Sequence, residues 1–264
     1  KSRPDDLAKL KSLSIESDET IKDSTSINNI CCLVSFINIS LLELSYCNLD
    51  ISKVINIICS SKIALLRLDL SGNHCSKDFI GGVVFPDSLY KFDFECIEWR
   101  GDSLLSFLTN TPFESAVELN LSKAELSDES WAKFFAGIPP PQKSPMIVKL
   151  NWSFNPFPIN FVNYILTMPC LSELNIHHCQ IQNVETIQLI AQALLEIPIR
   201  LLILRKSFKQ HPEFIFELKK AFIMSKTLQV LDVSENSIGN NGISLLLEVA
   251  HQSETLSTIS FDRS

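Results

Sequence analysis

Glycine is scarce in this chain, and the short motifs of the commonest catalytic sites are missing. Among its 264 residues there are seven glycines and no GxxxxGKS/T, GxGxxG, HExxH or GxSxG segment. Those motifs mark phosphate-binding loops, dinucleotide sites, zinc peptidases and serine hydrolases. Their absence predicts a protein that is not an enzyme and that needs no cofactor.

Long hydrophobic runs are missing too. The longer ones, such as Ile30–Val34 and Leu201–Leu204, are far too short to cross a bilayer. The chain starts at Lys1 with neither a Met nor an apolar signal segment, and we expect it to be a piece of a longer protein. Eight cysteines without a CxxC spacing predict free thiols in a reducing, cytoplasmic compartment, with Cys31 and Cys32 in a helix core.

The chain also has no excess of basic charge. Its 23 Lys and Arg residues stand against 30 Asp and Glu residues, which gives a formal net charge of −7. Affinity for duplex DNA comes mostly from Lys and Arg that neutralise phosphates, so no nucleic-acid partner is predicted. Because 45% of the residues are hydrophobic, the chain is not disordered and can form a sizeable core in one or two domains.

The sequence does contain one pattern that is repeated along its whole length. Leucine-type residues recur as LxxLxLxxN, most clearly in residues 65–73 and 228–238. The second apolar position of each copy falls at residues 13, 42, 68, 92, 119, 150, 174, 202, 231 and 259. A period of about 27 residues is typical of leucine-rich repeats, in which each repeat buries its apolar face only against its neighbours.

Each repeat is predicted to hold a strand, a turn and a helix, so the fold class is α/β. Alternating apolar residues make a short strand with one buried face, and the Asn or Cys that ends the motif satisfies backbone groups at the turn. Capping residues and helical spacing predict helices at 127–135, 184–195, 214–224 and 243–249. The alternative is an α/β protein whose leucines are spaced by chance.

A full helix in each repeat resembles the ribonuclease-inhibitor-like subclass of leucine-rich repeats. That resemblance implies a horseshoe-shaped solenoid of about ten repeats, with parallel strands on the concave face and helices on the convex face. We expect a single domain over residues 1–264, with an N-terminal strand and capping helix in 1–37 and regular repeats in 38–264. A proline-rich loop is inserted at 139–145, where the repeat spacing is longest.

The C-terminal end of this domain has no obvious polar cap. The last predicted strand, around Ile259, is followed at once by Asp262, Arg263 and Ser264. An uncovered strand edge and apolar stack would remain there. We therefore expect either that the parent protein continues beyond Ser264 or that this edge pairs with another chain, as in a homodimer.

The solvent-side residues of the strands form the candidate partner-binding surface, on the concave face. One column of them is acidic: Glu43, Asp69 and Asp93 are expected on adjacent strands about 5 Å apart. Arg67 and Lys91 lie beside this column and partly neutralise it. The alternative for each of these residues is an ordinary solvated surface.

One strand has apolar rather than polar residues on this surface. In residues 199–205, the register that buries Leu202 and Leu204 leaves Leu201 and Ile203 outside, next to Val230. Three such apolar residues have the composition expected of an interface core. The expected rim consists of Arg205, His177 and Asp232. The alternative is that another segment or a second copy of the chain covers the patch.

A metal site is not predicted, although one cluster has suitable residue types. His177, His178 and Cys179 are adjacent, with Cys170 nearby, and both residue types bind zinc. The repeat register instead places Cys179 at the buried turn position, His178 in the turn and His177 toward solvent. The cluster is therefore expected to be structural.

The C-terminal third resembles one family within this subclass. Residues 231–242, 245–249 and above all 255–264, which include Phe261-Asp262-Arg263, are similar to the leucine-rich region of CARMIL proteins, cytoskeletal linkers that regulate actin capping protein. The resemblance implies a cytoplasmic scaffold for protein partners, held at the cytoskeleton or at membranes by flanking domains. The capping-protein-interaction motif of that family has no counterpart in this chain.

Two other functions use the same fold, by analogy alone. A GTPase activator of the Ran type would need polar residues at a strand or loop edge, for which Arg67, Lys91 and Lys149 are candidates. A fragment of an innate-immune sensor would be supported by a nucleotide-binding domain in the parent protein.

Overall fold

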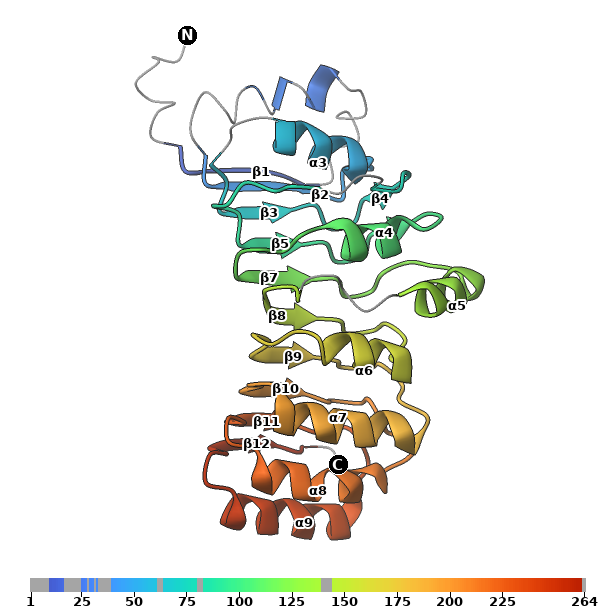
Figure 1. The fold of residues 1–264 in the computed structure, drawn as a ribbon, viewed down its shortest axis with the longest axis vertical. Helices are drawn as coiled ribbons and strands as arrows, with labels where there is room; N and C mark the ends of the chain where they lie inside the picture. Colours follow the sequence, from blue (N-terminus) through green and yellow to red (C-terminus); the bar gives the residue numbers. More distant parts are fainter. Residues whose placement is uncertain are drawn as a thin grey trace. The chain divides into compact units, whose positions relative to one another are not determined.

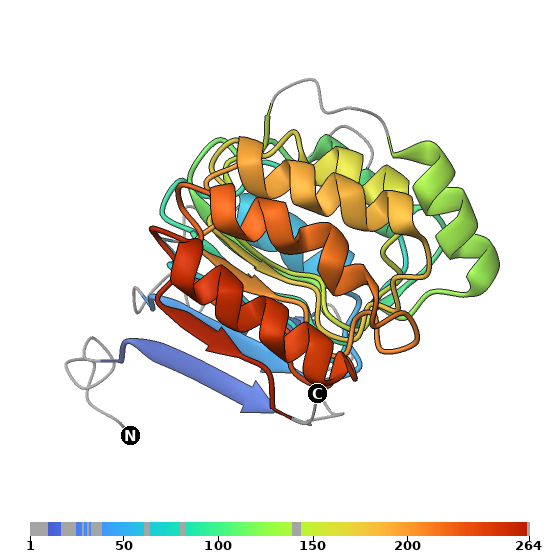
Figure 2. The same ribbon diagram turned by 90° about the horizontal axis from the view of Figure 1, so that it is seen from below.

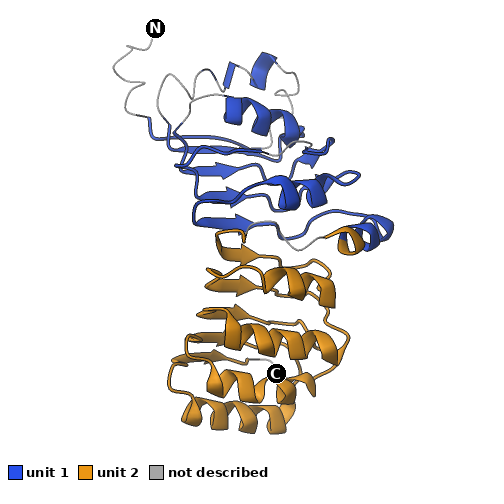
Figure 3. Ribbon diagram, viewed as in Figure 1, with its two compact units in different colours: residues 1–134 blue, residues 135–264 orange. Residues whose placement is uncertain are grey.

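The computed structural model describes residues 10–16, 25–27, 29–30, 32, 39–60, 64–79, 83–138 and 144–262. Residues 139–143 of the proline-rich insertion and most of the predicted N-terminal capping helix lie outside the described residues. The chain divides into two compact units, residues 1–134 and 135–264 (Figure 3). Each unit has its own strands and core, and the single domain expected over 1–264 stays a prediction.

The described part of the first unit contains five parallel strands in the order β1, β2, β3, β5 and β7 (Figure 1). Their bounds are Ser12–Glu16 for β1, Leu41–Ser45 for β2, Arg67–Asp69 for β3, Lys91–Asp93 for β5 and Val117–Asn120 for β7. One apolar residue of each strand faces its counterpart on the next: Leu13, Leu42, Leu68, Phe92 and Leu119. These are the strand positions that the sequence pattern predicts.

Helices and a core of aromatic rings accompany these strands. Helix α3 spans Ile51–Ser60 and α4 spans Ser103–Asn110, and the short strands β4 (His74–Cys75) and β6 (Glu98–Trp99) pair with each other. The buried ring of Phe94 lies 5.9 Å from that of Phe92 and 5.6 Å from that of Phe107, centre to centre. Tilted and edge-on packing of this kind stabilises a core beyond the burial of apolar area.

The described part of the second unit repeats the arrangement with strands β8 to β12. Their bounds are Ile147–Asn151 for β8, Glu173–Asn175 for β9, Leu201–Ile203 for β10, Val230–Asp232 for β11 and Thr258–Ser260 for β12. The helices of this unit are α6 (Ile159–Ile165), α7 (Val184–Glu196), α8 (Phe214–Met224) and α9 (Gly239–Gln252). Helices α7, α8 and α9 lie side by side on one face of the strands (Figures 1 and 2). A further helix, α5 (Asp128–Gly137), runs across the boundary between the units.

All four predicted helices are present. Helix α8 has the predicted bounds, whereas α9 begins at Gly239 rather than at residue 243. Its first turn, Gly239-Asn-Asn-Gly242, carries no apolar side chain. Apolar spacing therefore could not locate the start of α9.

Strand residues alternate between a buried face and an open one, as the pattern predicts. The middle residues of β3, β10 and β11 (Leu68, Leu202 and Leu231) are fully buried, and their neighbours on either side are only partly buried. Burying one leucine side chain contributes about 1.5–3 kcal/mol to stability. The α/β class with parallel strands alternating with helices is confirmed in both units, and the horseshoe shape stays a prediction.

The turn that follows each strand has the same backbone conformation in repeat after repeat. In every repeat from β2 to β11, the residue four positions after the shared apolar strand residue (Leu42 in β2, Leu231 in β11) has a positive φ. These residues are Tyr46, Gly72, Cys96, Lys123, Phe154, His178, Lys206 and Glu235. Glycine adopts this left-handed conformation without strain. At Gly72 a side chain is also excluded by space, because a Cβ atom would lie 2.2 Å from Cδ1 of Tyr46.

Buried asparagines close these turns, as the sequence predicts. The side chain of Asn73 accepts hydrogen bonds from the backbone N–H groups of Cys47 and Leu49 in the preceding repeat. Its Nδ2 donates to the carbonyls of Leu44 and Leu70, both at 2.7 Å. Consecutive repeats are thereby joined by polar bonds as well as by apolar packing.

The last strand is less covered than the strands before it. Ile259 in β12 is partly exposed, whereas its partner Leu231 is fully buried. The cause is topological, since among the described residues β12 has a neighbouring strand on one side only. None of the described helices is long and apolar enough to cross a membrane.

The cysteines that the structure describes are thiols rather than disulfides, and several are buried. Cys47, Cys75 and Cys179 are buried, and burial raises the pKa of Cys75 and of Cys179 to about 12. Cys32 is exposed, so its predicted place in a helix core is wrong. Cys31 lies outside the described residues.

Candidate functional site

The predicted site residues form two groups, one in each unit. The first unit holds Glu43, Arg67, Asp69, Lys91 and Asp93, and the second holds His177, Leu201, Ile203, Arg205, Val230 and Asp232. Within each group, strand pairing sets the neighbours. Each group therefore belongs to the sheet surface of its own unit.

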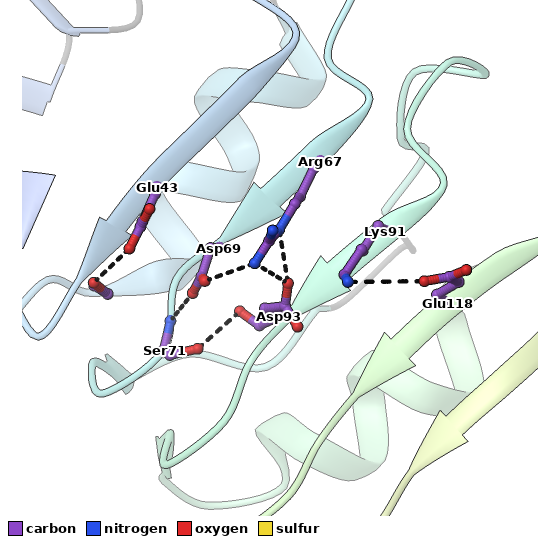
Figure 4. Close-up of polar contacts among 8 residues, drawn as sticks. Glu43, Arg67, Asp69, Ser71, Lys91, Asp93 and Glu118 are labelled. Carbon is purple, nitrogen blue, oxygen red and sulfur yellow. Dashed lines mark hydrogen bonds and ion pairs between the residues drawn. The ribbon is translucent and has the colours of Figure 1, made fainter. Parts of the chain in front are cut away.

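In the first unit, Arg67 lies between two aspartates on the open face of the sheet (Figure 4). Its Nε and Nη2 both lie 2.9 Å from Oδ2 of Asp93, and Nη2 lies 3.5 Å from Oδ2 of Asp69. Asp69 and Asp93 are partners on adjacent strands. One guanidinium therefore compensates two like charges that the parallel register brings side by side.

Other members of the acidic column are held by nearer neighbours. Oδ1 of Asp69 accepts a hydrogen bond from the backbone N–H of Ser71, and Oε1 of Glu43 accepts one from the hydroxyl of Ser45 at 3.5 Å (Figure 4). Nζ of Lys91 lies 3.9 Å from a carboxylate oxygen of Glu118. The acidic column predicted from the sequence is present, and much of its charge is neutralised within the sheet.

In the second unit, Leu201, Ile203 and Val230 form a continuous apolar patch. Leu201 faces Val230 across the β10–β11 pair, and Ile203 lies two residues further along β10. All three side chains are partly exposed on the face opposite buried Leu202 and Leu231. On the other side, Leu201 and Ile203 are flanked by polar residues of β9, Glu173 and Asn175.

Polar contacts fix the rim of the apolar patch. Arg205 forms an ion pair with Glu235 from the next repeat, and Nε of Arg205 lies 3.2 Å from the same carboxylate. Oδ1 of Asp232 accepts a hydrogen bond from the backbone N–H of Ser234 at 2.9 Å. The backbone N–H of His177 donates to the side chain of Asn175 at 3.0 Å. The apolar patch is therefore bordered by charges in defined positions.

The architecture is compatible with leucine-rich repeats, in strand order, register and turn chemistry. No family model matches this chain, and no curated protein matches it.

An aromatic stack beside this rim was not predicted from the sequence. The exposed ring of Phe154 stacks on His177 with 4.8 Å between ring centres, and His178 meets the edge of the same ring at 5.1 Å. Burial lowers the pKa of His177, and the charge of Arg205 lowers it further. Phe154 and His178 occupy the same turn position in consecutive repeats, so aligning the repeats by that position would have found the pair.

The histidines and cysteines of this region do not converge on one point. Sγ of Cys179 donates to the carbonyl of Trp152 at 3.4 Å, deep in the turn, and Sγ of Cys170 lies 3.8 Å from Sδ of Met146. Throughout the described ranges there is no group of three or more His, Cys, Asp or Glu residues placed to hold a metal ion. Cys179 thus fills the structural turn position that its repeat register predicts.

Proposed function

We propose that this chain is a leucine-rich-repeat protein of the ribonuclease-inhibitor-like subclass that binds protein partners and catalyses no reaction. One observation carries the proposal: the apolar patch of Leu201, Ile203 and Val230 lies on the open face of a sheet whose other outward residues are mostly polar. Apolar residues surrounded by a polar rim are typical of the centre of a protein interface.

The rigidity of the apolar patch favours binding. Its side chains stand on paired strands, so little conformational entropy is lost when a partner orders them. Bulky aliphatic residues give apolar area, whereas Arg205 and Asp232 on the rim can orient a partner of complementary charge. An elongated apolar or amphipathic segment with a mixed-charge border fits this surface.

More specifically, we propose that the chain belongs to a cytoplasmic cytoskeletal regulator similar to CARMIL proteins, because its C-terminal third resembles their leucine-rich region. The alternative is a Ran-type GTPase activator. Its candidate residues are already engaged within their own sheets: Arg67 with Asp93, and Lys149 with Glu173 at 3.2 Å. That engagement favours the scaffold. A single-turnover GTP hydrolysis assay with small GTPases separates the two, because acceleration by this chain would support the activator.

Two substitutions on the apolar patch test the scaffold. A partner is isolated from cytosolic extract on the wild-type chain, purified, and titrated against Leu201→Asp and Ile203→Asp. Placing a carboxylate in a desolvated interface centre should weaken binding by about 2 kcal/mol or more, which is roughly thirtyfold in Kd. The matched control is Leu66→Asp, which changes an exposed leucine in the first unit.

The proposal holds if both substitutions in the apolar patch weaken binding while Leu66→Asp leaves Kd unchanged. Thermal unfolding of all three variants serves as the folding control. Unchanged affinity in a correctly folded Ile203→Asp variant would exclude the apolar patch as the binding site.

A further inference from the structure

A small pocket lies on the turn side of the second unit, beyond the ends of β9 and β10. It has a volume of about 130 Å³. Its polar lining consists of His178, Gln180, Gln182, Lys206, Ser207, Lys209 and Gln210. Cations and amides thus line it, and no carboxylate does. The lining thus carries positive charge in a chain whose formal net charge is −7.

The base of the pocket is fixed. Ile181 and Phe208, which also line it, are buried. The backbone N–H of Ile181 donates to the carbonyl of Ser207 at 2.7 Å, and that of Phe208 donates to the side chain of Asn236 at 2.9 Å. These bonds tie three consecutive repeats together, so the backbone that carries the polar groups of the pocket is held in place. An apolar base also strengthens electrostatic attraction in the pocket by lowering the local dielectric.

The two lysines of the pocket have no acidic partner among the described residues. The carboxylate of Glu235, in the next repeat, forms an ion pair with Arg205. The charges of Lys206 and Lys209 are therefore available to a ligand. Lys206 also sits in the left-handed turn position next to His178 in the preceding repeat.

We propose that this pocket binds a phosphate-class oxyanion, with Lys206 and Lys209 supplying positive charge and His178 and the glutamine amides supplying hydrogen bonds. A tetrahedral dianion matches two lysine charges and several donors spread around a small cavity. The volume of the cavity is sufficient for one such group. Both free phosphate and a phosphorylated side chain of another protein present this chemistry.

The test measures phosphate binding through the backbone amide signals of residues 206–210 in ¹⁵N-labelled full chain. Inorganic phosphate is titrated against chloride at constant ionic strength, and a phosphoserine peptide and its unphosphorylated twin form the second arm. Lys206→Gln and Lys209→Gln should each weaken binding about fivefold or more. Lys220→Gln in α8 removes the same charge away from the pocket and should leave binding unchanged.

Saturable binding of either probe that is weakened in both pocket variants and unchanged in Lys220→Gln supports the proposal, and the probe that binds more tightly identifies the source of the anion. Absence of saturable binding by both probes overturns it, as does equal weakening in all three lysine variants. Because inorganic phosphate needs no protein partner, this result is independent of whether the apolar patch binds one.

Discussion

A single carboxylate, Asp50, joins two repeats in the first unit and begins a helix. It directly precedes α3, and its Oδ1 accepts hydrogen bonds from the backbone N–H of Ser52 at 3.2 Å and from the hydroxyl of Ser52 at 2.7 Å. The same carboxylate accepts hydrogen bonds from the backbone N–H and the hydroxyl of Ser76 in the next repeat. Asp50 thus caps the N-terminus of α3 and links it to its neighbour.

These contacts predict a pH-dependent contribution to stability. Burial raises the pKa of Asp50, but the hydrogen bonds from Ser76 and Ser52 outweigh it and hold the pKa below its ordinary value. A carboxyl group whose pKa is lowered by folding stabilises the protein above its unfolded pKa, near 4, and that contribution is lost as the pH falls through the folded value. Asp50→Asn should therefore lower the free energy of unfolding by about 1–2 kcal/mol at pH 7.

The measurement is urea unfolding of Asp50→Asn and of wild type between pH 7 and pH 3. The difference in free energy of unfolding should shrink as the pH falls below about 4. Asp87→Asn, at an exposed position, is the control and should have a small effect throughout. A difference that grows on acidification would contradict this role of Asp50.

At the scale of elements, the turn after β3 depends on a buried amide. Asn73 is 4% exposed and makes hydrogen bonds to backbone groups of two repeats. Asn73→Ala would leave several of those buried groups without partners, and each such group costs about 1–3 kcal/mol. We expect a total loss of about 3 kcal/mol, measured by urea unfolding.

A second asparagine of the first unit provides the matched comparison. Among the described residues, Oδ1 of Asn120 accepts hydrogen bonds only locally, from the backbone N–H and the hydroxyl of Ser122, and its side chain is partly exposed. Water can replace these bonds, so Asn120→Ala should cost under about 1 kcal/mol. Equal losses for the two alanine variants would show that the Asn73 bonds do not hold the repeats together.

Strands and turns differ in how far the sequence could predict them. Leu202 and Leu231 were placed correctly because alternation along a strand depends on local burial alone. The stack of Phe154 on His177 was missed, since the apolar pattern does not reveal the left-handed turn at Phe154, and only an alignment of the repeats by their turn position brings Phe154 and His178 together. The pocket at Lys206 was missed for a related reason: two segments from consecutive repeats contribute its lining, and their turn conformation brings them together.

In the acidic column, too, the sequence pattern predicts the strand pairing but not the side-chain geometry. The pairing of Asp69 with Asp93 follows from the repeat register, which the sequence pattern predicts. The approach of Nε and Nη2 of Arg67 to one carboxylate oxygen of Asp93 depends on rotamers of a long side chain, which the pattern does not determine. Sequence therefore predicts which residues share a face, and side-chain geometry decides which charges remain available.

At the scale of the whole molecule, stacked repeats contact mainly their neighbours, so a defect in one repeat should be felt locally. Leu202 is fully buried between its partners Leu174 and Leu231. Leu202→Ala should cost about 2–5 kcal/mol, because a cavity remains where the side chain was. Hydrogen exchange measured by mass spectrometry should then quicken in β9, β10 and β11, whereas β2, β3 and β5 of the first unit should keep their protection.

A second variant, in the first unit, tests whether the two units open independently of each other. Leu68 occupies the equivalent buried position in β3, and Leu68→Ala should quicken exchange in the first unit while sparing β9 to β11. Two local responses would mean that residues 1–134 and 135–264 open independently. If either variant instead lost protection evenly from β2 to β12, the repeats would form one cooperative domain over the whole chain, because opening any repeat would then open all of them.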